Sequence, residues 1–133
     1  MDIKPDIETR ADIECFIKAF YETVRADEVL GIIFNEVVLM DWDHHIPLIT
    51  DFWETILLDN PVYTRNAMEV HYTLNRIYPL TKQHFDTWLR IFNETIDSLF
   101  SGSRTELAKK RAHSIAMLML HKMEPGTNSK SIL

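Results

Sequence analysis

Histidines are the side chains of this sequence best suited to bind a metal ion or to move a proton near neutral pH. There are six of them: His44, His45, His71, His84, His113 and His121. None lies in a common zinc pattern such as HExxH, and the single cysteine, Cys15, cannot form a CxxC pair. His44 and His45 are neighbours that would point about 100° apart on a helix, so they cannot converge on one ion.

His45 is the member of this pair that we expect to face the protein interior. It shares a helical phase with Trp42, Ile49 and Trp53, whereas His44 looks outward to solvent. The last two histidines of the chain lie on a largely polar side of a helix, and we expect them to be solvated.

His71 lies in a short apolar stretch, "AMEVHYTL", that follows a loop. A lone histidine in such a place is usually held by ordinary hydrogen bonds. The alternative is an axial ligand to haem iron, because a neutral imidazole on a short helix is the usual proximal arrangement in globins. The residues alone leave both interpretations open.

Tyr21 and Trp88 each carry a hydrogen-bond donor on a mostly apolar ring. Both fall on apolar stripes of helices, so the ordinary interpretation is a core residue whose polar atom meets a nearby acceptor. The functional interpretation is a donor that stabilises a bound ligand carrying partial negative charge.

Four substantial helices and two short ones are expected to position these residues, with no strand signal of comparable strength. Apolar residues recur at three- and four-residue steps over Thr9–Arg25, Trp42–Leu57, Leu80–Leu99 and again after Ser103. Thr81 is suited as an N-cap, and Ser103 with Glu106 resembles a capping box. The predicted fold class is all-α, either a four-helix bundle or crossed helices of globin type.

The composition indicates one domain with a substantial core. The 133 residues are 46% hydrophobic with only 3 Gly and 5 Pro, which argues against a turn-rich β fold. The formal charge of −6 gives no basic footprint for nucleic acid, and no apolar run is long enough to span a membrane. The first residues do not resemble a signal peptide, and one cysteine fits a reducing cytoplasm. We expect a cytoplasmic domain over residues 1–122 and a flexible tail over 123–133.

Five blocks of the sequence, taken in order, resemble the group III truncated haemoglobins. They are "FYETVRAD…LGIIF", "DWDHHIPLITDFWETILL", "YTRNAMEVHYTL", "HFDTWLRIFNETID" and "RAHSIAML". The order of the blocks and the spacing between Tyr21, His45, His71 and Trp88 make the combination specific. Other truncated-haemoglobin groups carry glycine pairs near helix ends, whereas the glycines here are isolated, which favours the third group.

The resemblance implies a truncated globin with a two-over-two helical sandwich around haem b. It makes His71 the proximal ligand of the iron. It places four residues on the distal side, where ligands bind: Tyr21, His45, Ile49 and Trp88. The further residues that would line the haem pocket are Phe34, Phe52, Trp53 and Met68.

Pro47 bears on how firmly His45 is held. Proline lacks a backbone donor and disfavours helical backbone at Ile46, which costs little only within the first helical turn. A helix that begins near Asp43 puts Pro47 at or just past that turn. A helix that begins near Ile46 leaves His45 at its entrance, where it would swing between the pocket and solvent as a gate. We predict such a mobile His45.

The function implied by the resemblance is binding of oxygen or another diatomic ligand by a haem protein. Redox chemistry on oxygen, nitric oxide or peroxide is an extension of this, as a nitric oxide dioxygenase or a peroxidase-like enzyme. It would need an external reductase, because the sequence has no Gly-rich loop for a nucleotide. The alternative from another class is a haem-free helical module that binds an apolar ligand or a protein.

Overall fold

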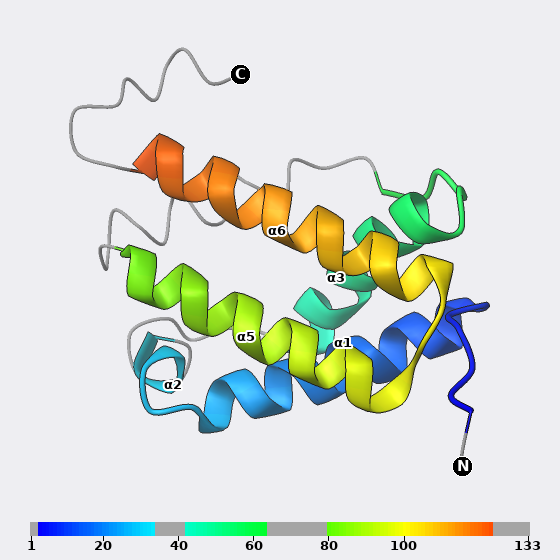
Figure 1. The fold of residues 1–133 in the computed structure, drawn as a ribbon, viewed down its shortest axis with the longest axis horizontal. Coiled ribbons are helices and arrows are strands. Elements are labelled where there is room, and N and C mark those ends of the chain that lie inside the picture. The colour runs from blue at the N-terminus through cyan, green and yellow to red at the C-terminus, as the bar shows by residue number, and fades with distance from the viewer. Residues whose placement is uncertain (1–2, 34–41, 64–79, 124–133) are drawn as a thin grey trace.

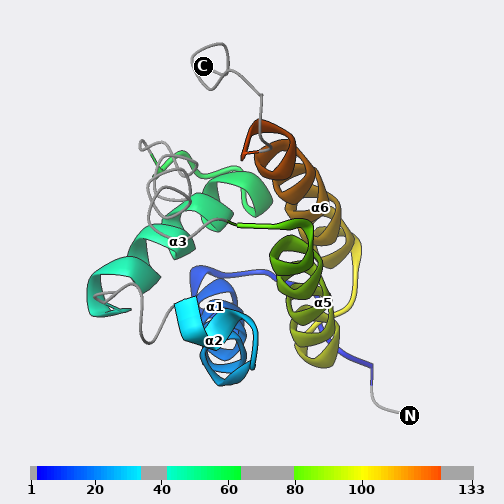
Figure 2. The same ribbon diagram turned by 90° about the vertical axis from the view of Figure 1, so that its left-hand side faces the viewer.

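The computed structural model describes residues 3–33, 42–63 and 80–123, which form two packed layers of helices. The helices are α1 (Arg10–Ala26), α2 (Leu30–Ile32), α3 (Trp42–Leu57), α5 (Lys82–Leu99) and α6 (Ser103–Met123). Figure 2 shows α3 and α1 on one side and the α5–α6 pair on the other. Within these ranges there is no strand, and no helix is long and apolar enough to cross a membrane. The predicted all-α fold with two-over-two packing is confirmed.

Helix α1 is delimited by local side-chain contacts. The Thr9 hydroxyl accepts from the backbone N–H of Asp12, and the Asp12 carboxylate accepts from the backbone N–H of Thr9, which closes a capping box. After Ala26 the backbone becomes extended at Asp27, whose carboxylate accepts from the first N–H groups around α2. The prediction of a helix over Thr9–Arg25 is confirmed to within one residue.

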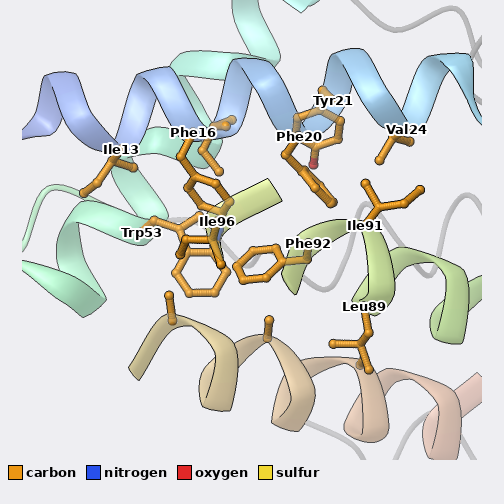
Figure 3. Packing of buried hydrophobic residues seen from close by; sticks show 14 of the residues in the cluster. Ile13, Phe16, Phe20, Tyr21, Val24, Trp53, Leu89, Ile91, Phe92 and Ile96 are labelled. Carbon is orange, nitrogen blue, oxygen red and sulfur yellow. The ribbon is translucent and has the colours of Figure 1, made fainter. Parts of the chain in front are cut away.

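The core lies where α1, α3 and α5 meet, as Figure 3 shows. Phe92 of α5 is fully buried, and its ring lies 5.0 Å from Phe16 and 5.5 Å from Phe20, both on α1. Trp53 of α3 reaches the same ring at 5.2 Å. The contacts of Phe92 with Phe16 and Phe20 are edge-to-face, an arrangement that stabilises the core beyond the simple burial of area. They fix how the two layers cross, and therefore where the polar residues beside them lie.

Helices α5 and α6 lie side by side and antiparallel, joined by a short connection (Figure 1). Three alanines of α6 are buried against the rest of the protein, Ala108, Ala112 and Ala116, and their small side chains let the backbones approach closely. Thr81 precedes α5 as predicted, and its backbone N–H donates to Nδ1 of His84 (2.8 Å). His84 therefore has a structural role at the start of this helix.

The start of α6 is capped by a residue that is distant in sequence. The Asp6 carboxylate accepts from the backbone N–H groups of Arg104 (2.9 Å) and Thr105 (3.0 Å) and from the Thr105 hydroxyl (2.9 Å). Burial acts to raise the pKa of Asp6, but these hydrogen bonds outweigh it and hold the pKa below its ordinary value. The predicted capping box of Ser103 and Glu106 is wrong, because α6 begins at Ser103 and its first amides bind Asp6 instead.

Helix α3 begins at Trp42, which places Pro47 inside the helix. Pro47 cannot donate a hydrogen bond to the carbonyl of Asp43, but both residues are exposed, so water can satisfy that carbonyl. Of the two starts considered from the sequence, the one near Asp43 is confirmed to within one residue and the one near Ile46 is wrong. His45 consequently lies within the helix and not at its entrance, which removes the reason for expecting it to act as a gate.

Candidate functional site

Tyr21 of α1 and His45 of α3 form a hydrogen bond where the two helices pack together. The Oη atom of Tyr21 lies 3.3 Å from Nε2 of His45, and the ring centroids are 5.3 Å apart. Tyr21 has only 7% of its surface exposed, and His45 is half-buried. The inward direction of His45 agrees with its helical phase, and His44 is exposed as predicted.

Burial keeps both members of this pair uncharged at neutral pH. It raises the pKa of the Tyr21 phenol, which therefore stays protonated. Burial, with a smaller contribution from His44, lowers the pKa of His45 to about 4. A neutral imidazole has one N–H and one bare nitrogen, so Nε2 either donates to the phenol or accepts from it.

Arg25 and Trp42, to which the sequence assigned no role, lie beside this pair. The Trp42 ring is 5.1 Å from the Tyr21 ring and 5.7 Å from the His45 ring. The guanidinium carbon of Arg25 is 5.0 Å from the Trp42 ring centroid, within the range of a cation–π contact. The spacing of the sequence could have indicated these positions. Arg25 follows Tyr21 by four residues and Trp42 precedes His45 by three, so Arg25 shares a helix face with Tyr21, and Trp42 shares one with His45.

Trp88 of α5 packs next to this group through Phe20. Its ring lies 5.6 Å from Phe20 and stacks on Phe92 at 5.4 Å. Phe20 in turn contacts Tyr21, with the ring centroids 4.9 Å apart. Trp88 is half-buried. Its indole belongs to the same aromatic cluster as the Tyr21–His45 pair, where it contacts the apolar rings of Phe20 and Phe92.

Comparisons with known proteins identify the family. No family model matches the sequence. The chain is similar to a group 3 truncated haemoglobin from Campylobacter jejuni, with 30% identity over 103 residues that cover 75% of this chain and 79% of the relative. The chain belongs to the group III truncated haemoglobins. It also resembles the crystal structure of a group III truncated haemoglobin from C. jejuni, with a TM-score of 0.79 and 26% identity over 95% of this chain and 99% of the other.

Membership of this globin family implies a haem site, and the described residues of this truncated haemoglobin fit the distal side of one. Tyr21 and His45, which we predict to lie on the distal side and hereafter call the distal pair, present a phenol and a neutral imidazole from a largely apolar, aromatic setting. Neither carries a charge that would be costly to bury beside an apolar macrocycle. Such uncharged hydrogen-bonding groups suit small, weakly polar ligands.

The other predicted pocket residues of α3 have different environments. Ile49, one turn after His45, is half-buried against the core. Phe52 is also half-buried, and its ring contacts Tyr63 at 5.3 Å. Trp53 is 3% exposed and packs on Phe92 in the core between α3 and α5. The roles of these three residues toward haem stay predictions.

Four further predictions concern residues outside the described ranges. They are the short helix around "AMEVHYTL", the proximal ligand His71 and the pocket residues Phe34 and Met68. The expected flexible tail also lies outside the described residues from 124 onwards, and Met123 is the last residue of α6.

A polar cluster fixes the other end of the α1–α3 contact in this truncated haemoglobin. Arg10 at the start of α1 donates to Asp51 (2.6 Å) and Glu54 (2.9 Å) of α3. The Glu54 side chain is only 8% exposed, and its second oxygen accepts from the amide of Asn60. Because the distal pair spans the same two helices, this cluster contributes to its alignment.

Proposed function

We propose that this truncated haemoglobin holds haem b through His71 and binds oxygen or another diatomic ligand beside the distal pair. Haem supplies an iron centre that binds such ligands and exchanges electrons with them. The observation that supports this function most directly is the hydrogen bond between the buried Tyr21 and the neutral His45. In this buried setting little water would compete with the phenol for a ligand, so a donor there would be more effective than in bulk solvent.

The direction of that hydrogen bond determines what Tyr21 can do. When the proton of His45 is on Nδ1, Nε2 accepts from Tyr21 and the phenolic hydrogen is occupied. When the proton is on Nε2, it donates to Tyr21 Oη, and the phenolic hydrogen is left to donate to a ligand. In this second tautomer His45 orients Tyr21, and Tyr21 is the donor that stabilises negative charge on the ligand.

A peroxidase-like role would use His45 or Tyr21 to move a proton at the ligand. A general base works best when its pKa is close to the operating pH, and a pKa of about 4 makes His45 a weak base at neutral pH. Nitric oxide dioxygenation makes no such demand on His45 and is the second candidate. Its electrons would come from a separate reductase.

Haem uptake tests this function. The purified protein is expected to show a Soret band, and His71→Ala is expected to abolish or greatly weaken haem retention. His113→Ala is the matched control, because His113 is an exposed histidine of α6. A protein that stays colourless after haem is supplied would favour the haem-free helical module.

A further inference from the structure

We propose that Arg25 and Trp42 are positioning residues that hold the distal pair in its hydrogen-bonded arrangement. Their use in ligand binding rests on the function proposed above, whereas the contacts themselves stand on the structure alone.

The four residues form an inner and an outer couple across the same two helices. Tyr21 and Arg25 are one turn apart on α1, and His45 and Trp42 are one turn apart on α3. The inner couple is the Tyr21–His45 hydrogen bond at 3.3 Å. The outer couple is the Arg25–Trp42 cation–π contact at 5.0 Å, and the Trp42 ring also contacts both inner residues. Moving Trp42 therefore disturbs both helices and both members of the distal pair.

Exposure increases from the inner couple to the outer one. Tyr21 is buried, Trp42 is half-buried and Arg25 is exposed. Trp42 and His45 are both half-buried, and Trp42 contacts the buried Tyr21 on one side and the exposed guanidinium on the other. Arg25 is in the last turn of α1, where a cation interacts favourably with the helix dipole.

Pro47 gives side-chain contacts a larger share in holding the beginning of α3. Proline provides no N–H for the carbonyl of Asp43, so the first turn of α3 has one backbone hydrogen bond fewer than a regular helix. Trp42 and His45 are both in the stretch that this loss weakens. The contacts of Trp42 with Arg25 and Tyr21 tie that stretch to α1 and so keep His45 in reach of Tyr21.

The test compares Arg25→Gln and Arg25→Lys with the control Lys18→Gln in the haem-loaded protein. Lys18 is an exposed cation of α1 that pairs with Glu14, so its replacement removes the same charge from the same helix without touching Trp42. Carbon monoxide is the probe, because its stretching frequency falls when a distal donor approaches the ligand. The imidazole signals of His45 in the nuclear magnetic resonance spectrum report its surroundings independently of ligand binding.

Arg25→Gln is expected to increase the fraction of carbon monoxide without a distal donor by about two- to fivefold, from the usual strength of an exposed cation–π contact. It should also move the His45 signals toward those of an exposed imidazole. In both measurements Arg25→Lys should lie between Arg25→Gln and the unmodified protein, because an ammonium keeps the charge but not the flat stacking surface. Lys18→Gln should match the unmodified protein.

The positioning role is overturned if Arg25→Gln behaves like Lys18→Gln in both measurements. Failure of the haem function has a different signature, since the unmodified protein would then take up no haem. In that event the His45 signals of the same variants, measured on the haem-free chain, still decide whether Arg25 positions the pair.

Discussion

The phenolic oxygen of Tyr21 and Nε2 of His45 lie 3.3 Å apart, although the two residues are 24 positions apart in the sequence. Each comes from a different helix, so the hydrogen bond exists only when α1 and α3 are packed in the observed way. Under the proposed function, ligand binding and helix packing are therefore coupled in this truncated haemoglobin. A change that shifts either helix should then alter the binding of the ligand.

Tyr21→Phe should raise the dissociation rate constant of oxygen about tenfold, which corresponds to the loss of one hydrogen bond worth roughly 1 to 1.5 kcal/mol. Stopped-flow displacement of oxygen by carbon monoxide measures this rate. Trp88→Phe is the comparison: it should have a smaller effect, because the Trp88 ring contacts Phe20 and Phe92. An unchanged rate in Tyr21→Phe would rule out the donor role of the phenol.

His45 should make the protein less stable as the solution becomes acidic. Folding lowers the pKa of His45 from 6.5 to about 4, so the unfolded chain binds the additional proton first. The contribution is complete above about pH 6.5 and is lost as the pH falls toward about 4, by on the order of 1 to 3 kcal/mol. His45→Gln can still hydrogen-bond to Tyr21 but cannot titrate, so it should flatten this part of the profile.

Urea unfolding at a series of pH values measures this effect on the free energy of unfolding. His113→Gln serves as the control, because it makes the same replacement at an exposed histidine of α6. Identical slopes for His45→Gln and the unmodified protein would show that His45 is not the group responsible.

Arg10→Met should destabilise the protein by about 1 to 3 kcal/mol, because it leaves the buried carboxylate of Glu54 with Asn60 as its remaining hydrogen-bond partner among these contacts. Asp51→Asn should cost less, since Asp51 is more exposed than Glu54. Thermal unfolding of both variants measures the difference. Equal losses would mean that burial of Glu54 does not decide the strength of this cluster.

Asp6→Ala should lower the free energy of unfolding by about 1 to 2 kcal/mol, the usual cost of losing a helix N-cap. Asp97→Ala is a matched control: it removes an aspartate whose carboxylate pairs with Lys109 at the surface, and it should cost less than about 1 kcal/mol. Urea titration of both variants gives the comparison. A loss for Asp6→Ala no greater than that for Asp97→Ala would contradict the capping role.

Gly102→Ala should be destabilising by about 1 to 3 kcal/mol, because Gly102 has a φ of 145° that other residues rarely adopt. The added Cβ would also lie 2.5 Å from Cγ of Asp6 and displace the cap. Ser101→Ala tests the same connection without either effect. A stability for Gly102→Ala as high as that for Ser101→Ala would show that the connection between α5 and α6 accommodates the added Cβ without cost.

The sequence by itself determined the features that depend on short separations along the chain. Helical periodicity located α1, α3 and α5, and the predicted cap at Thr81 involves a residue only three positions away. The phase of α3 selected His45 over His44 for the interior. These predictions succeeded because side chains within one helical turn are neighbours whatever the rest of the chain does. The combined blocks of sequence also identified the family correctly.

Only the tertiary structure decided which of these faces meet. The cap of α6 comes from Asp6, 98 residues before Arg104, so no local pattern could reveal it. The sequence placed Tyr21 and His45 on buried faces, but their hydrogen bond and the Arg25–Trp42 contact beside it depend on how α1 and α3 pack. That packing is set by the shared core around Phe92 and by the Arg10 cluster, which are contacts between distant segments. Local spacing predicts which residues share a face, whereas the partner of that face is fixed by the fold as a whole.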